Sequence, residues 1–304
     1  MKAFVFSEEL DLLNELVAGA TQLAGEGAEV TAIALSDVAF EVKGATKVLS
    51  VELPADAPVD AVAPSIALAV EEAQPVFVLI GATRIGHSIA ARVAAKLGTS
   101  AIVDAKAVEM VDGAPQVLHM LFGGAALRND VATGPVSVIT LPAAMYEPLG
   151  AASGSVEAIN WVEPAAKVVK KGTRKKEASS KDVTTEKVVV CGGAGLKSRD
   201  DLAMIEDLAN KLDGVTGCTR PLTEGADALF SGEPYIGCSG VYVRPDLYIG
   251  VGVSGQTQHT VGFEDAKVTV AINSDKNASI FRYSDYGIVG DFRAVVPALA
   301  SLIG

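Results

Sequence analysis

Aromatic residues are scarce in this sequence, at 5% of its 304 residues, and there is a single tryptophan. Hydrophobic residues still make up 49% of the chain, so aliphatic side chains supply most of the apolar surface. Such a composition is typical of parallel β-sheets covered by helices, whose strands are buried on both faces. We therefore expect an α/β fold with mainly parallel sheets.

Basic residues are also few. Lys and Arg number 25 against 37 Asp and Glu, which gives a net charge of −12. Recognition of nucleic acid depends on a basic face that neutralises phosphates. Nucleic-acid binding is therefore not expected, whereas a protein partner is compatible with this charge.

Cysteines and long apolar runs are equally limited. The three cysteines, Cys191, Cys218 and Cys238, form no CxxC pair, so no zinc or iron–sulfur site is expected. No run approaches the ~20 apolar residues of a membrane span. The N-terminus, MKAFVFSEELDLL, lacks the long apolar core of a signal peptide. These absences predict a cytoplasmic protein without membrane insertion.

The length predicts two domains, each large enough for its own core. Residues 170–187 hold seven of the 25 Lys and Arg and only one large apolar residue, Val183. This composition is typical of a linker. We expect an N-terminal scaffold domain over residues 1–169 and a C-terminal domain over residues 188–304.

In the first half, predicted strands and helices alternate as in a doubly wound sheet. The turn after the first strand contains Glu8 and Glu9 but no glycine, so no dinucleotide is expected there. The loop from Gly81 to Gly86 has two interpretations: an anion site with Arg84 and His87, or the favoured role in packing or subunit contact. The predicted strands are 3–6, 29–35, 47–52, 75–80, 103–111, 116–122 and 136–141, and the helices are 9–26, 59–72 and 85–97.

The second half repeats this alternation. A strand at 187–191 is followed by the loop Gly192–Ser198 and a helix at 201–212, but the loop matches neither the Rossmann nor the P-loop fingerprint. Further strands are predicted at 215–218, 247–253, 268–272 and 280–283, the last followed by a turn at YGIVGD. Polar loops then recur at the carboxyl ends of successive parallel strands, where ligands bind in open α/β sheets.

The segment SGQTQHTVG between two of these strands is rich in hydrogen-bond donors. A flavin needs donors for its pyrophosphate and a charge or dipole beside its ring. Ser254, Gln256 and Gln258 can donate, Gly255 permits a close backbone approach, and His259 can hydrogen-bond or place positive charge near the ring. Arg220 supplies a permanent cation. Taken singly, His259 is more often a satisfied half-buried residue, Arg220 a surface ion-pair partner and Asn273 a turn former.

The positions Ser254, Gly255, Gln258, His259, Gly262 and Ala271-Ile272-Asn273 resemble the signature of the α subunits of electron transfer flavoproteins. The resemblance extends through GGAGLKS, CTR and DYGIVGD. It implies two doubly wound α/β domains, with FAD bound by the C-terminal one. The expected cofactor contacts are Gly195, Thr219, Arg220, Gly237, Ser239, Gly240, Ser254, Gly255, Gln256, Gln258, His259, Asn273 and Asp291.

The resemblance further implies pairing with an electron transfer flavoprotein β subunit. Dehydrogenases, such as the acyl-CoA dehydrogenases of fatty acid oxidation, would donate electrons that pass to a redox acceptor. Whether the pair is a simple carrier or a bifurcating system, and whether the partner holds AMP or a second FAD, stays open. The chain departs from the family pattern at Ala194, where an Arg is usual, and at Cys238.

Two other functions are considered. The first is a redox-inactive scaffold subunit of the same fold. The second is an NAD-dependent dehydrogenase, which needs an acid/base pair at its substrate. The predicted cluster contains no second histidine or lysine beside His259, which disfavours an enzyme with its own substrate.

Overall fold

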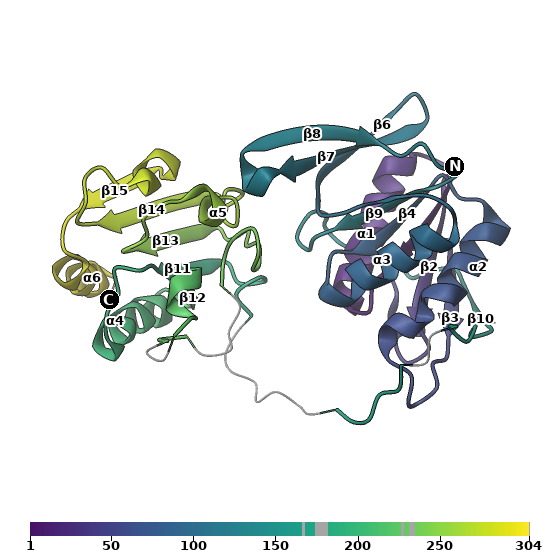
Figure 1. The fold of residues 1–304 in the computed structure, drawn as a ribbon, viewed down its shortest axis with the longest axis horizontal. Helices are drawn as coiled ribbons and strands as arrows, with labels where there is room; N and C mark the ends of the chain where they lie inside the picture. Colours follow the sequence, from purple (N-terminus) through teal and green to yellow (C-terminus); the bar gives the residue numbers. More distant parts are fainter. Residues whose placement is uncertain (166–167, 174–181, 226–227, 231–234, 304) are drawn as a thin grey trace. The chain divides into compact units, whose positions relative to one another are not determined.

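The computed structural model describes residues 1–165, 168–173, 182–225, 228–230 and 235–303. The chain divides into two compact units (Figure 1). The first comprises Met1–Leu121 and Ala126–Lys175, and the second Phe122–Ala125 and Lys176–Gly304. The division near residue 175 falls inside the stretch predicted as a linker, although residues 174–181 lie outside the described residues.

The first unit contains a seven-stranded, all-parallel sheet in the order β10-β3-β2-β1-β4-β9-β5. The order reverses between the neighbours β1 and β4, which is the mark of a doubly wound sheet. Its strands are β1 (Lys2–Phe6), β2 (Glu29–Leu35), β3 (Lys47–Val51), β4 (Phe77–Gly81), β5 (Ala101–Ile102), β9 (Ser137–Leu141) and β10 (Ser155–Ile159).

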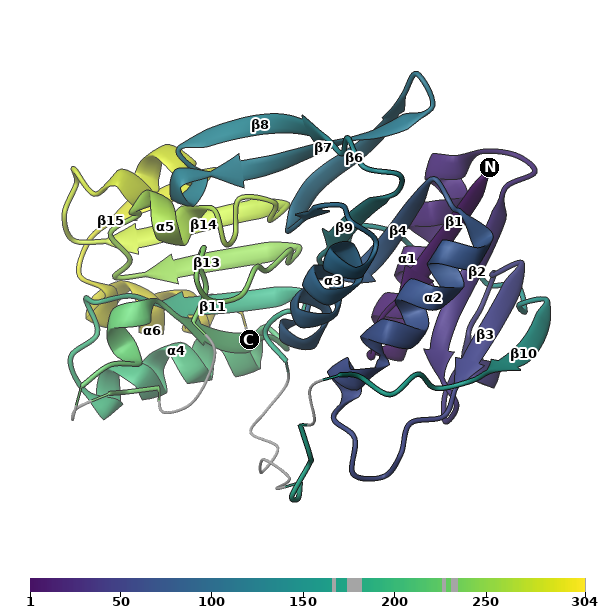
Figure 2. The same ribbon diagram turned by 45° about the vertical axis from the view of Figure 1, so that its right-hand side comes forward.

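Helices cover both faces of this sheet (Figure 2). Ala3 and Val5 of β1 point to the face covered by α1 (Leu10–Ala24), whereas Phe4 and Phe6 point to the face covered by α2 (Ala63–Ala73) and α3 (Arg84–Lys96). Successive side chains of a strand alternate between faces, so a central strand of this kind must be apolar throughout. All four residues are buried.

The loop between β4 and α3 is closely packed. A Cβ on Gly86 would collide with the carbonyl oxygen of Gly81, so only glycine lets the helix approach the strand this closely. The hydroxyl of Thr83 caps α3 by accepting from the Gly86 amide and donates to the carboxylate of Glu8. The Gly86 amide at the helix start is thus bonded within the protein, and together with the close approach of Gly86 this favours the packing interpretation over an anion site.

A separate antiparallel sheet is formed by β6 (Ala105–Val111), β7 (Ala114–Leu121) and β8 (Ala126–Val131). Asp112 and Gly113, both with positive φ, make the predicted hairpin turn between β6 and β7. Strands β5, β8 and β10 were not predicted, because β5 has only two residues, β8 is largely exposed and carries Arg128 and Asp130, and β10 alternates weakly.

The second unit contains a five-stranded parallel sheet in the order β12-β11-β13-β14-β15. Helices α4 (Arg199–Lys211) and α6 (Phe292–Leu302) pack on one face, and a cluster around Tyr248 and Phe263 fills the other. The strands are β11 (Val188–Gly192), β12 (Val215–Cys218), β13 (Leu247–Val251), β14 (Val268–Asn273) and β15 (Tyr286–Val289).

Two boundaries in this unit differ from the sequence prediction. Ile280–Tyr283 is part of a 3-10 helix, Ser279–Tyr283, and the predicted turn at YGIVGD contains strand β15. Ile280 is buried against the sheet, which explains its strand-like apolar character. Val183 packs in the core of the second unit, so that unit begins before residue 188.

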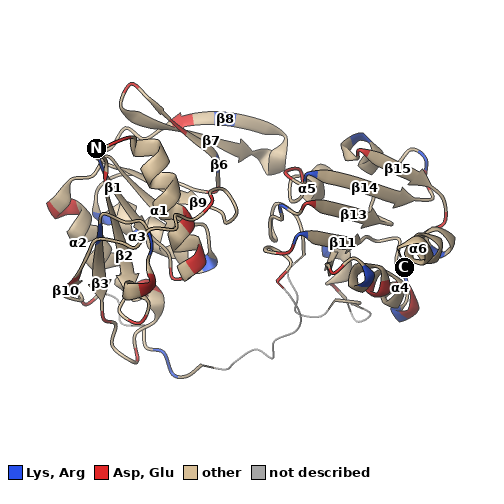
Figure 3. Ribbon diagram, turned by 180° about the vertical axis from the view of Figure 1, so that it is seen from behind, with Lys and Arg blue, Asp and Glu red and all other residues tan. Residues whose placement is uncertain are grey.

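Charged residues occur on elements of both units, as Figure 3 shows. The five strands of the second sheet carry none, so any charge near the edge of that sheet comes from its loops. Within the described residues, no helix combines the length and the apolar character that crossing a bilayer requires. The same residues contain no cluster of metal-ligating side chains.

Candidate functional site

The candidate site lies at the carboxyl edge of the second sheet. Because all five strands are parallel, the loops that follow them leave from the same edge. The chain passes from β11 to β12 on one side and later to β13 on the other, so the order reverses beside β11. In open α/β sheets, ligands bind at this reversal point.

The loops after β11 and β13 are in direct backbone contact. A Cβ on Gly193 would collide with the carbonyl of Gly252, and one on Gly195 would lie 2.9 Å from the Gly252 Cα. The amides of Gly193 and Gly195 donate to the carbonyls of Val251 and Gly252 at 2.9 and 3.0 Å. The amides of Gly193 and of Gly195, an expected cofactor contact, therefore join two loops of the protein.

Other amides of the 192–198 loop are also occupied. The amide of Leu196 donates to Gly193, and those of Lys197 and Ser198 donate to the carboxylate of Asp201. Ala194 is exposed, and within the described part of the chain its amide has no partner. Asp201 was missed from the sequence, although the Ser198-x-x-Asp201 spacing is that of a capping box.

The SGQTQH segment forms a tight turn into the short helix α5 (Thr257–Thr260). Gly255 has φ of +83°, and a Cβ there would collide with the amide of Ile280. The Ser254 carbonyl accepts from Ile280, and the Asn273 side chain donates to the Val253 carbonyl at 2.7 Å. The turn is thus held from both sides. Ser254, Gln256 and Gln258 are exposed.

The turn at residues 235–241 packs against α5. Gly237 approaches so closely that a Cβ would lie 2.5 Å from the Gln258 carbonyl, which also accepts from the Cys238 amide at 2.8 Å. The Gly240 amide donates to Gly237, while Ser239 is exposed and accepts from the Tyr235 hydroxyl. The structure therefore brings the predicted residues of both segments together.

His259 lies in the interior. One ring nitrogen, Nδ1, is 2.9 Å from the Ile236 carbonyl and must donate to it. The other, Nε2, is 2.8 Å from the Tyr248 hydroxyl, which leaves it the acceptor role. Burial lowers the pKa of His259, and the bond to Ile236 only partly opposes this. His259 is therefore a neutral residue that links α5 to the Ile236 carbonyl and the Tyr248 hydroxyl. It does not supply the positive charge near the ring that the sequence analysis considered.

Thr219 and Arg220 follow β12. Thr219 is buried and its amide donates to Gly192, yet its hydroxyl has no hydrogen-bond partner in the described structure. Arg220 is exposed and its Nε donates to Glu224 at 2.7 Å. Glu224 above all, and then Tyr235 and Cys238 of the neighbouring 235–241 turn, raise the pKa of Arg220.

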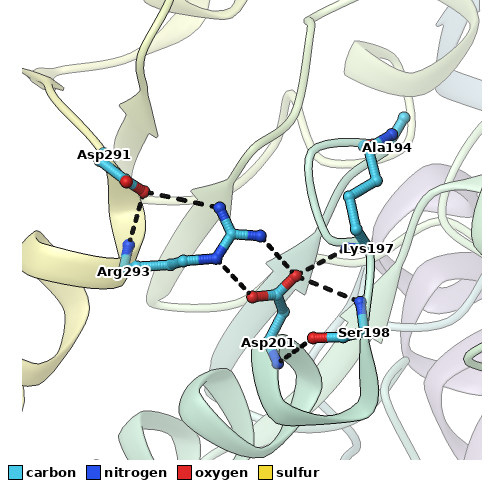
Figure 4. A network of polar contacts seen from close by, with 6 residues as sticks. All are labelled: Ala194, Lys197, Ser198, Asp201, Asp291 and Arg293. Carbon is cyan, nitrogen blue, oxygen red and sulfur yellow. Dashed lines mark hydrogen bonds and ion pairs between the residues drawn. The ribbon is translucent and has the colours of Figure 1, made fainter.

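Asp291 is the N-cap of α6, and its side chain accepts from the Arg293 amide at 3.0 Å. Its carboxylate bonds to its own helix start and not to the SGQTQH segment among the described residues. Its connection to the rest of the site runs through Arg293, whose guanidinium binds Asp201 beside the 192–198 loop (Figure 4). Asp201 and Arg293 are the charged pair that sequence reasoning did not identify.

The donors present suit a nucleotide cofactor. Exposed hydroxyl and amide side chains follow β12 and β13, at Ser239, Ser254, Gln256 and Gln258. The buried hydroxyl of Thr219 lacks a partner in the described structure. Buried polar groups in proteins are nearly always paired, so an unpaired one at a ligand edge fits a group supplied by a ligand. These features define the second unit as a cofactor-binding α/β domain.

Comparison with known proteins specifies the class. The family model described as the electron transfer flavoprotein FAD-binding domain matches residues 182–264, and the electron transfer flavoprotein domain matches residues 11–167. YdiR of Escherichia coli (strain K12), named as an electron transfer flavoprotein subunit, is 42% identical over 242 residues, 79% of this chain and 77% of that protein. FixB of Salmonella typhimurium is 33% identical over 306 residues, 99% of this chain and 97% of FixB.

The chain belongs to the electron transfer flavoprotein family and is an α-type subunit. Its cofactor is FAD, and the match to the FAD-binding domain begins at residue 182, which agrees with the burial of Val183 in the second unit.

Proposed function

We propose that this chain is the FAD-carrying subunit of a heterodimeric electron transfer flavoprotein. FAD lies along the carboxyl edge of the second sheet, accepts electrons from a dehydrogenase such as an acyl-CoA dehydrogenase, and passes them to a redox acceptor. A related β subunit completes the molecule. The convergence of the Thr219, Gly237 and SGQTQH segments at one edge carries this proposal.

The chain's own residues bind and orient the cofactor. Ser254 and Gln256, in the turn before α5, and Gln258, within α5, would donate hydrogen bonds to the cofactor. The buried Thr219 hydroxyl would form a hydrogen bond with it. Arg220 provides the permanent positive charge near the ring. FAD supplies the redox chemistry when bound, while the dipoles and charges around it set its potential.

Not every predicted contact has the same support. His259 acts indirectly, because both of its nitrogens are bonded inside the domain. Gly237, Gly240 and Gly255 allow tight backbone turns in which a side chain would collide with neighbouring atoms. Gly195 and Asn273 hold the loop after β13 in place through hydrogen bonds to the carbonyls of Gly252 and Val253. Asp291 contributes through the start of α6.

The test is co-expression of this chain with a β-type electron transfer flavoprotein subunit, followed by reduction of the purified complex with an acyl-CoA dehydrogenase and its substrate. Bleaching of the flavin absorbance at catalytic dehydrogenase concentration is expected. Arg220→Gln should slow this reduction or change the reduction potential of the flavin. Arg282→Gln, which replaces another arginine of the second unit, should do neither. A complex that keeps its flavin but is never reduced by any dehydrogenase would favour a redox-inactive scaffold subunit.

A further inference from the structure

Asp201 places a carboxylate at the N-terminus of α4, where a phosphate group would otherwise find free amides. It is 2% exposed, and its Oδ2 accepts from the amides of Lys197 and Ser198 at 2.7 and 3.2 Å (Figure 4). The Ser198 hydroxyl accepts from the Asp201 amide in return. The anion position at the start of this helix is therefore filled by the chain itself.

Arg293 compensates this buried charge. Its Nε donates to Oδ1 and its Nη2 to Oδ2 of Asp201, both at 2.8 Å, in a bidentate fork. Arg293 comes from the first turn of α6, 92 residues further along the chain, and its side chain is 46% exposed. Burial alone would raise the pKa of Asp201, but the amides and the guanidinium together lower it, so the carboxylate is ionised at neutral pH.

The compensation matters because the ligand of this edge is an anion. The FAD pyrophosphate carries negative charge, and a buried carboxylate that loses its partner exerts a field that water screens poorly. Ala194, in the loop before the helix cap, is an exposed residue whose amide has no partner in the described structure. Because the positive charge of Arg293 compensates the ionised carboxylate of Asp201, this part of the loop can face an anion without repulsion.

We propose that the Asp201–Arg293 pair is a charge-compensating positioning device for FAD. The Asp201 carboxylate holds the 194–198 loop and the start of α4 in place. The Arg293 guanidinium compensates the negative charge of Asp201, so that this charge does not repel the pyrophosphate. The inference rests on the proposed placement of FAD at this edge. It assigns neither residue to the redox chemistry.

The test measures the dissociation constants of FAD, ADP and riboflavin for the deflavinated full chain in complex with its β-type partner. Arg293→Gln leaves an unpaired carboxylate and should weaken FAD and ADP binding at least about tenfold, the scale of a charge-assisted interaction. Arg293→Lys retains the charge and should bind close to the wild type. The double variant Asp201→Asn/Arg293→Gln removes both charges and should recover most of the affinity.

Riboflavin, which has no phosphate, should bind all variants alike. Arg199→Gln is the matched control, because Arg199 lies in the first turn of α4 with Asp201 but donates, among the described residues, to the carbonyls of Ala228 and Leu229. Equal affinities for Arg293→Gln and Arg199→Gln, or a double variant no tighter than Arg293→Gln, would overturn the proposal. Wild-type protein that binds no FAD at all would instead refute the proposed function.

Discussion

The hydroxyl of Thr219 has no partner in the described structure, although its oxygen is fully buried. A buried unpaired hydroxyl costs about 1–3 kcal/mol, so Thr219→Val should leave the unfolding free energy of the flavin-free protein unchanged or increase it. The same variant should weaken FAD binding by roughly five- to tenfold, because the cofactor would lose one hydrogen bond. Calorimetric titration and denaturant unfolding measure the two effects.

Thr260→Val is the control for this experiment. Thr260 is also buried, but its hydroxyl donates to the Thr257 carbonyl. It should therefore lose stability where Thr219→Val does not. If Thr219→Val destabilises the flavin-free protein and leaves the FAD dissociation constant unchanged, Thr219 is a core residue without a role in the site.

His259 predicts a pH dependence of stability in the second unit. Its pKa in the folded protein is lowered by burial, so the unfolded chain takes up the proton first. The contribution of the neutral ring is complete above the ordinary value of 6.5 and is lost as the pH falls below it. Urea unfolding, monitored through the release of flavin, should show lower stability at about pH 5.5 than at about pH 7.5.

His259→Gln should reduce this slope and cost about 1–3 kcal/mol near neutral pH, because the Tyr248 hydroxyl and the Ile236 carbonyl lose their partner. His87→Gln is the control, since the hydrogen bond to Asp104 raises the pKa of His87 and gives it the opposite pH dependence. An unaltered slope in His259→Gln would show that the imidazole is not the titrating group.

At the residue scale, the sequence predicted which segments meet but not what each side chain does. Ser254, Gly255 and Gln258 occupy one turn, as their spacing indicated. His259 was expected to be available to the flavin, yet the tertiary contact with Tyr248 on β13 holds it inside. Arg293 could not be paired with Asp201, because no local pattern links residues 92 positions apart.

At the scale of elements, the turn before α5 depends on Gly255. Both the positive φ and the contact with Ile280 forbid a side chain, so Gly255→Ala should lose about 3 kcal/mol or more and release FAD. Gly225 is a matched control: its φ is +92°, but no atom of the described residues lies within 4 Å of the place that a Cβ would take, so Gly225→Ala should cost only about 1 kcal/mol. Similar losses for both variants would show that backbone strain alone matters.

The strands of both parallel sheets were largely predictable, because buried strands need continuous apolar runs. Strand β2 matches the predicted range 29–35, and β12 matches 215–218. Strand β15 escaped prediction: all four of its residues are exposed at the sheet edge, and the neighbouring buried Ile280 mimics a strand signal. Edge strands lack the two-sided burial that makes a strand recognisable.

At the scale of the whole molecule, we expect trypsin to cut first within residues 170–187. This stretch supplies seven Lys and Arg residues, and the chain divides between its two units near residue 175. Brief digestion followed by mass spectrometry should yield two fragments that each resist further cleavage. A first cut within either parallel sheet would contradict this boundary.

The central claim is that the second unit of this chain holds FAD at the carboxyl edge of its sheet. The most direct measurement is the flavin content of the purified complex, determined by absorbance after release, for the wild type and for Gly255→Ala beside Gly225→Ala. We predict that Gly255→Ala lowers the content by one FAD per chain, while Gly225→Ala retains it. Wild-type flavin content in a folded Gly255→Ala complex would contradict this placement of the cofactor.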